Sequence, residues 1–204
     1  TLNGTTNGGI TAAAPDATNQ LTGLLSATDI DGDQLSYQLL GTPIDGLTIN
    51  TDGSWAFNPS DDHYQDLASG NTQTITVNYG VSDLNGGSSQ GSFNINISGT
   101  NDKPTANTSA LVLPSIQEDT TLNVSEAQLL NGITDIDGDQ LTIVPASINI
   151  TTGDASVELA PGGGWIITPD VHYNGEISFS YSVSDGTTGD EVTSTATFQV
   201  LSVN

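Results

Sequence analysis

The chain has 204 residues and a net charge of −23, because 24 acidic residues accompany a single basic one, Lys103. This length allows one large domain or two ordinary ones. Nucleic acid is a poor partner for such a chain, and so is an anionic membrane, since both require clusters of Lys or Arg. There is no cysteine and no 18-residue apolar run, so we expect neither disulfides nor membrane insertion, and metal ions remain as the available cross-link.

The first 20 residues are rich in Thr, Asn, Gly and Ala, and they predict a loose beginning with one edge strand at most. No initiator Met and no signal peptide is found at Thr1, so we expect an excised piece of a larger protein. Alternating apolar and polar residues begin at 21–27 and lead into an Asp-rich loop at 28–35.

Strands are predicted wherever this alternation continues through the first half. They cover residues 35–40, 47–50, 54–58 and 73–83, followed by a return strand marked by Phe93, Ile95 and Ile97. Asp52-Gly53 lies between two of these β-forming runs and is a strong hairpin signal. On the long strand, one face is expected to carry Ile75, Val77, Tyr79 and Val81.

The second half repeats this plan. Strands are predicted at 121–124, 141–144, 157–159, 165–168, 177–185 and 192–200, with one helical turn within 125–131 capped by Ser125. Matching residues lie 102 to 110 positions apart: Trp55 with Trp165, Pro59 with Pro169, His63 with His172, and Asp83 with Asp185. These matches indicate a tandem repeat of about 100 residues.

About seven short strands per repeat predict an all-β protein with two tandem Ig-like or cadherin-like Greek-key β-sandwich domains. Strand character stops at the segment 99–104, where Pro104 forbids a continuing central ladder. We therefore predict one domain over residues 1–102 and a second over residues 103–204.

The eight residues Thr-Asp-Ile-Asp-Gly-Asp-Gln-Leu occur twice, at 28–35 and 134–141. Each copy places three carboxylates at alternate positions, and these repel one another unless something positive lies among them. The carboxylates belong to Asp29, Asp31 and Asp33 in the first copy and to Asp135, Asp137 and Asp139 in the second. A calcium ion, which accepts six to eight oxygen ligands, is the first hypothesis. The alternative is an Asp-rich turn whose side chains accept hydrogen bonds from backbone amides.

An EF-hand is excluded, because glycine takes the fourth position of each loop and the twelfth is Leu40 or Ala146 rather than Glu. The remaining ligands must therefore come from elsewhere in the fold. Asp83 and Asp185 end the penultimate strand of each repeat, so each can meet the Asp loop of its own domain.

The linker residues Asn101 and Asp102 would then face the second Asp loop and complete an interdomain calcium site. An ordinary Asx turn at these two residues is the alternative.

Several motifs carry a resemblance to known families. Asn101-Asp102-Lys103-Pro104 resembles the cadherin linker motif, while Thr-Asp-Ile-Asp and Val-Ser-Asp resemble its Asp-x-Asp and late-strand Asp ligands. Gly-Thr-Asn-Asp-Lys-Pro, together with the Asp-Gly-Ser-Trp hairpin, is similar to the VCBS repeats of bacterial adhesins. The second half resembles the cadherin-like tandem repeats of the same proteins. The resemblance covers nearly the whole chain and implies calcium-rigidified segments of very large secreted adhesins of the RTX type.

We therefore expect a non-enzymatic, calcium-rigidified spacer of a bacterial surface adhesin that functions in cell adhesion and biofilm formation. It would be secreted to the cell surface and monomeric. Its partners would be neighbouring repeats of the same polypeptide, and other regions of the protein would contact any carbohydrate or protein receptor. The alternative is a carbohydrate- or peptide-binding module that presents Trp or Tyr.

We expect structural roles for His63 and His172 and core packing for Trp55 and Trp165.

Overall fold

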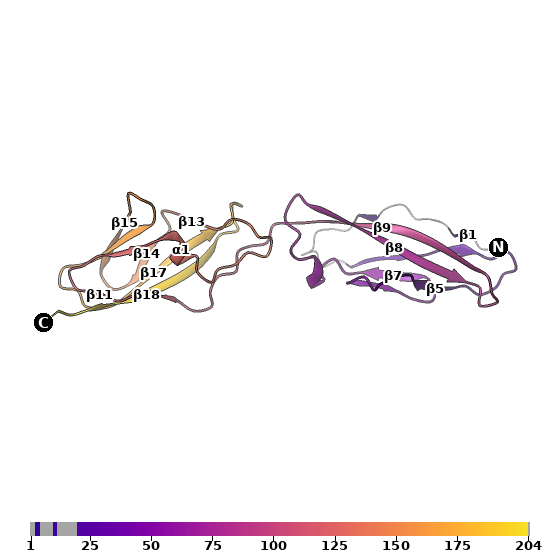
Figure 1. The fold of residues 1–204 in the computed structure, drawn as a ribbon, viewed down its shortest axis with the longest axis horizontal. Helices are drawn as coiled ribbons and strands as arrows, with labels where there is room; N and C mark the ends of the chain where they lie inside the picture. Colours follow the sequence, from indigo (N-terminus) through magenta and orange to yellow (C-terminus); the bar gives the residue numbers. More distant parts are fainter. Residues whose placement is uncertain (1–2, 5–9, 12–19, 204) are drawn as a thin grey trace. The chain divides into compact units, whose positions relative to one another are not determined.

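The computed structural model describes residues 3–4, 10–11 and 20–203 (Figure 1). The chain divides into two compact units, Thr1–Asn101 and Asp102–Asn204, and this division falls one residue before the predicted boundary. The edge strand predicted within residues 1–20 lies mostly outside the described residues. Two short strands are described there, β1 (Asn3–Gly4) and β2 (Ile10–Thr11).

The described part of the first domain consists of two larger sheets and one two-stranded sheet. The four-stranded sheet has the order β2-β9-β8-β5, the three-stranded sheet has the order β3-β7-β6, and β1 pairs with β4. The strands are β3 (Leu21–Leu24), β4 (Ala27–Thr28), β5 (Ser36–Leu39), β6 (Leu47–Ile49), β7 (Ser54–Phe57), β8 (Thr72–Ser82) and β9 (Ser88–Ser98). The 3-10 turn η1 (Asp62–Tyr64) follows β7. The long antiparallel pair β8–β9 is visible along this domain in Figure 1.

The period-two pattern explains how these sheets bury a core. The predicted face of β8 is buried at Val77, Tyr79 and Val81, and half-buried at Ile75. Phe93, Ile95 and Ile97 of the neighbouring strand β9 continue this face, and Trp55 and Phe57 of β7 belong to the same core cluster. Because side chains alternate along a strand, the same register turns the polar residues of β8 and β9 to solvent.

The predicted hairpin at Asp52-Gly53 is confirmed between β6 and β7. The Asp52 carboxylate accepts hydrogen bonds from both the N–H and the hydroxyl of Ser54, at 2.9 and 2.6 Å. Gly53 has φ = 87°, and a Cβ there would lie 2.9 Å from the carbonyl oxygen of Leu25. Only glycine suits this position, because it tolerates positive φ and needs no room for a side chain.

The second domain has the same arrangement of a larger and a smaller sheet. Its larger sheet has the order β10-β18-β17-β13, with β11 on β18 and β14 on β17, and its smaller sheet has the order β12-β16-β15. The strands are β10 (Leu111–Val112), β11 (Ile116–Gln117), β12 (Leu122–Val124), β13 (Thr142–Ile143), β14 (Asn149–Thr152), β15 (Ala155–Leu159), β16 (Trp165–Pro169), β17 (Gly175–Ser184) and β18 (Val192–Leu201). The alternate residues Ile177, Phe179, Tyr181 and Val183 of β17 are fully buried. The predicted all-β fold with two tandem sandwiches is confirmed.

Three short strands, β10, β11 and β14, were not predicted from the sequence. Strands β10 and β11 have two residues each, lie on either side of Pro114, and run parallel to β18. Strand β14 carries an irregularity in its register with β17 between Ile150 and Thr152. A run of two residues has no periodicity to detect, so only the partner strand defines it.

The predicted helical turn is α1 (Glu126–Leu129), and Ser125 caps it. The Ser125 hydroxyl accepts a hydrogen bond from the Gln128 N–H at 3.3 Å, while the Gln128 side chain accepts one from the Ser125 N–H at 2.9 Å. This reciprocal pair is a capping box. Within the described part of the chain, α1 is the one α-helix, and no helix there has the length and apolar character to cross a bilayer.

Replacing Ser125 with Ala should therefore destabilise the second domain by about 1 kcal/mol, the usual cost of a lost N-cap. Denaturant unfolding followed through Trp165 fluorescence would measure this loss, in a Trp55→Phe background that leaves Trp165 as the single Trp. The matched control is Ser109→Ala at an exposed bend residue, for which we expect almost no change. Equal effects of the two substitutions would contradict a stabilising cap.

Candidate metal centre

The second Asp loop is curled by its own first carboxylate. The Oδ1 atom of Asp135 accepts hydrogen bonds from the N–H groups of Asp137, at 2.9 Å, and Asp139, at 3.4 Å. Gly138 provides the left-handed residue that the bend needs, with φ = 77°. This local pattern brings three side chains, spaced two residues apart, to the inside of one turn.

The three carboxylates converge. One ligand oxygen from each of Asp135, Asp137 and Asp139 lies within 4.8 Å of the others, and all three residues are half-buried. Two of the oxygens, Oδ2 of Asp135 and Oδ1 of Asp137, are buried and have no hydrogen-bond partner among the described residues. Leaving a buried, charged oxygen unpaired is costly, so these atoms fit a bound cation.

The first residue of the second domain also meets this loop. The N–H of Asp102 donates a hydrogen bond to Oδ2 of Asp137 at 2.7 Å, which ties the start of the domain to a residue 35 positions further along the chain. Asp137 therefore accepts a backbone hydrogen bond with Oδ2, while its Oδ1 is buried and has no hydrogen-bond partner among the described residues.

The electrostatics of Asp137 reflect this crowding. Burial raises the pKa of Asp137, and the charges of Asp135, Asp139 and Asp185 raise it further, while the hydrogen bond from Asp102 opposes these effects. In the absence of a cation, the charged form of Asp137 is therefore disfavoured. A divalent ion among these groups would reverse the balance, because it would replace repulsion between anions with attraction.

Asp185 lies close enough for its charge to act on Asp137, as the repeat pattern predicted. Its own Oδ1 accepts a hydrogen bond from the N–H of Thr187 at 2.7 Å, which fixes the turn after β17.

One ion pair was not predicted from the sequence: the Lys103 ammonium lies 3.4 Å from Oδ1 of Asp190. The presence of a single cation in an acidic chain was the signal that could have pointed to this ion pair.

The predicted ligand Asn101 belongs to the other compact unit, so its role at this cluster stays a prediction from the sequence.

The first Asp loop has the same local fold. The Oδ1 atom of Asp29 accepts hydrogen bonds from the N–H groups of Asp31, at 2.9 Å, and Asp33, at 3.2 Å, and Gly32 has φ = 79°. However, Asp31 is exposed where its counterpart Asp137 is half-buried. Among the described residues, only the second loop brings three acidic ligand atoms within 4.8 Å of one another.

Asp83, the remaining predicted ligand, shapes the turn after β8. Its Oδ1 accepts hydrogen bonds from the N–H groups of Asn85 and Gly87, both at 2.8 Å. The bond from Asn85 is the largest cause that lowers the pKa of Asp83. The structure thus supports the Asx-turn interpretation for one oxygen of Asp29 and one oxygen of Asp83. A metal site at Asp29, Asp31, Asp33 and Asp83 stays a prediction.

The histidines and tryptophans lie outside this centre. His63 Nδ1 lies 3.6 Å from Oδ2 of Asp45, and His172 Nδ1 lies 3.6 Å from Oδ2 of Asp119. The side chains of Trp55 and Trp165 are only 2% and 4% exposed, which confirms the prediction of core packing. Neither indole can therefore form a surface platform for a sugar ring.

Different family models match the two halves of the chain. A family model described as a cadherin-like domain matches residues 100–201, and one described as a bacterial Ig domain matches residues 4–96. No curated protein matches the chain.

Solved structures match the chain at low sequence identity. Domains EC1-4 of Drosophila N-cadherin match with 15% identity and a TM-score of 0.55, over 96% of this chain and 47% of that one. An endo-fucoidan hydrolase from glycoside hydrolase family 107 matches with 21% identity and a TM-score of 0.35, over 97% of this chain and 28% of that one. The chain thus spans less than half the length of either protein, and the N-cadherin likeness concerns the fold alone.

Proposed function

The chain belongs to the cadherin-like domain family through its second half and carries a bacterial Ig domain before it, and we propose that it is a calcium-dependent spacer. Tandem domains of these two kinds are typical of bacterial surface proteins. In this proposal the parent protein is a secreted adhesin that functions in cell attachment and biofilm formation. The segment holds other parts of that adhesin away from the cell and performs no catalysis.

The observation that carries the proposal is the pair of buried, unpartnered oxygens on Asp135 and Asp137. They lie in a cluster of three carboxylates with a fourth, Asp185, near enough to act on it. Hard cations prefer such oxygen ligands, and calcium accepts more of them, in looser geometry, than magnesium does. We therefore propose Asp135, Asp137, Asp139 and Asp185 as the calcium ligands of the second domain. The sequence pattern adds Asn101 and Asp102 of the linker to this proposal.

In this proposal calcium neutralises the carboxylates of the second Asp loop, and the hydrogen bonds of the chain hold that loop in place. The hydrogen bond from the Asp102 amide to Asp137 already holds the start of the second domain against the loop. An ion bound to the loop would order Asp137 further, so breaking this hydrogen bond would cost more free energy. Between tandem domains without a large apolar interface, relative motion is the default. We propose that calcium restrains this motion and so gives the spacer its stiffness. The first Asp loop, with Asp29, Asp31, Asp33 and Asp83, would serve an upstream repeat in the same manner.

Calcium titration calorimetry on the whole chain tests the proposal, with small-angle scattering recorded in calcium and in chelator. We expect a dissociation constant of about 1 mM or lower, the range of extracellular calcium modules. We also expect a narrower distribution of solution dimensions when calcium is bound. Asp137→Ala should remove the tighter binding event, whereas Asp31→Ala, at the equivalent position of the first loop, should leave it intact. No binding heat in the millimolar range, with identical scattering curves, would refute the proposal.

A further inference from the structure

One face of the larger sheet of the first domain is free of charge, although the chain carries 24 acidic residues. On β5, β8 and β9 this outward face consists of rows of residues paired across the strands. The rows are Ser36–Ser82–Ser88, Gln38–Gly80–Gln90, Asn78–Ser92, Thr76–Asn94 and Thr74–Asn96. Each side chain in them offers a hydroxyl or a primary amide, apart from the single glycine.

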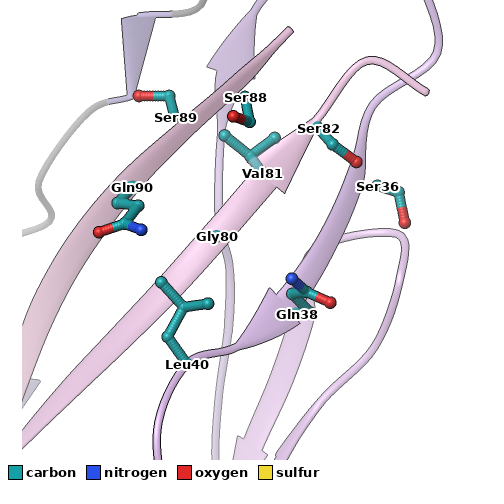
Figure 2. Close-up of a pocket in the computed structure, with 9 residues that line it drawn as sticks. All are labelled: Ser36, Gln38, Leu40, Gly80, Val81, Ser82, Ser88, Ser89 and Gln90. Atoms are coloured by element: carbon teal, nitrogen blue, oxygen red, sulfur yellow. The ribbon is translucent and has the colours of Figure 1, made fainter. Parts of the chain in front are cut away.

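The face is hollowed at that glycine. Gly80 lies in register between Gln38 on one neighbouring strand and Gln90 on the other, and Figure 2 shows the two amide side chains on either side of it. The hollow measures about 210 Å³, and the side chain of Leu40 lies beside Gly80 in its wall. We call it the Gly80 trough; its lining is Ser36, Gln38, Leu40, Gly80, Val81, Ser82, Ser88, Ser89 and Gln90.

The backbone conformation does not require a glycine at this position, because Gly80 is not among the glycines with positive φ. An added Cβ would lie 3.3 Å from the flexible end of Leu40, so that side chain would have to shift by a few tenths of an ångström. A glycine inside a strand weakens it by roughly 0.5–1 kcal/mol and often marks a site where a ligand approaches the backbone closely. The trough therefore exists at a cost to the stability of β8.

A second, shallower depression continues the trough. It is lined by Leu40, Gly41, Asn78, Gln90, Gly91 and Ser92, so the two hollows share Leu40 and Gln90. Together they form an extended polar surface with one apolar wall. Within the described part of the chain, no hydrogen bond engages the side-chain amides of Gln38 and Gln90, so their donors and acceptors are available.

The second domain lacks this combination. The repeat aligns Gly80 with Ser182, because Tyr79-Gly80-Val81 corresponds to Tyr181-Ser182-Val183. Ser182 pairs with Thr193 rather than with a glutamine, and its N–H donates a hydrogen bond to the Ser147 hydroxyl at 2.8 Å. The glycine flanked by two amides is therefore specific to the first domain and does not follow from the repeat.

We propose that the Gly80 trough binds a neutral oligosaccharide. Sugar hydroxyls both donate and accept hydrogen bonds, as do the amide and hydroxyl groups of the trough, and Leu40 provides an apolar contact for the C–H face of a pyranose ring. The net charge of −23 disfavours uronate or sulfated chains, and the absence of carboxylates from the lining disfavours cations. The continuation into a second hollow favours a ligand of more than one sugar unit.

To test this proposal, backbone amide NMR spectra of the whole chain would be recorded during titration with neutral hexasaccharides of glucose, xylose, mannose and galactose. Polygalacturonate and a neutral hexapeptide serve as comparison ligands. We expect at least one neutral hexasaccharide to shift the amides of β5, β8 and β9 with an affinity in the millimolar range or better. Gln38→Ala and Gln90→Ala should each weaken this binding several-fold, and Gly80→Val, which fills the trough, should weaken it about tenfold or more.

Matched controls separate the trough from the rest of the sheet. Thr76→Val lies on the same face of β8 outside the trough, and Gln199→Ala removes an exposed amide from the second domain; neither should alter binding. Unchanged thermal melts of the variants would show that the first domain stays folded. The proposal is overturned if no neutral hexasaccharide shifts these amides at about 10 mM. It is equally overturned if Gly80→Val binds like the unmodified chain, or if polygalacturonate or the peptide is the stronger ligand.

Discussion

Removal of calcium should lower the melting temperature of the second domain by about 10 °C or more. A ligand present at a hundred times its dissociation constant stabilises the folded state by about 2.7 kcal/mol. For a domain of about 100 residues, each kcal/mol shifts the midpoint by roughly 4–8 °C. The physical source is the acidic cluster, where calcium would pair two buried oxygens of Asp135 and Asp137 that have no partner among the described residues.

Thermal melts of the Trp55→Phe variant would measure this shift, because its only Trp, the buried Trp165, reports on the second domain. The melts would be recorded with calcium, with magnesium and with chelator. Magnesium should restore less of the stability than calcium does, since it demands a near-ideal octahedral site. Superimposable curves in calcium and in chelator would argue directly against an ion in the second Asp loop.

Asp137→Asn should change stability in opposite directions with and without calcium. In calcium, the variant loses a charged ligand and should be destabilised by about 2 kcal/mol, most of the stabilisation that calcium provides. In chelator, the same substitution removes a half-buried charge that repels Asp135, Asp139 and Asp185, so the variant should be more stable than the unmodified chain. The amide oxygen of Asn can still accept the hydrogen bond from Asp102, so the backbone contact is retained.

Unfolding free energies in calcium and in chelator, taken from denaturant titrations, measure both signs. Asp31→Asn is the matched control, since Asp31 occupies the same place in an identical loop but is exposed. The unfolding free energy of the second domain should change little with Asp31→Asn in both conditions. A loss of stability in chelator as well as in calcium would show that Asp137 acts through its structural hydrogen bond alone.

The pH dependence gives a further readout of the same residue. A carboxyl group whose pKa is raised above its ordinary value of 3.8 binds its proton more tightly in the folded than in the unfolded state. The charged Asp137 carboxylate therefore lowers the free energy of unfolding at neutral pH, and this loss disappears as the pH falls through the raised pKa. Without metal, the second domain should gain stability over this window, and Asp137→Asn should reduce the gain.

Local sequence was sufficient for the long strands and the turns. Alternation placed Val77, Tyr79 and Val81 on the buried face of β8, because a strand turns successive side chains to opposite sides. The hairpin at Gly53 and the cap at Ser125 were also predictable, since each depends on hydrogen bonds within four residues. Strands β10 and β11 were not, because two-residue runs become strands only by pairing with the distant β18.

The two Asp loops separate what sequence determines from what tertiary structure decides. Eight identical residues give nearly identical local hydrogen bonds, so Asp29 and Asp135 curl their loops in the same way. Yet Asp31 is exposed, whereas Asp137 is half-buried and accepts a hydrogen bond from Asp102, 35 residues away. The sequence by itself therefore determined the fold class and the carboxylate-bearing loops. Only the tertiary structure decided which loop gathers its carboxylates and leaves oxygens unpartnered, because burial depends on distant segments that the local sequence does not contain.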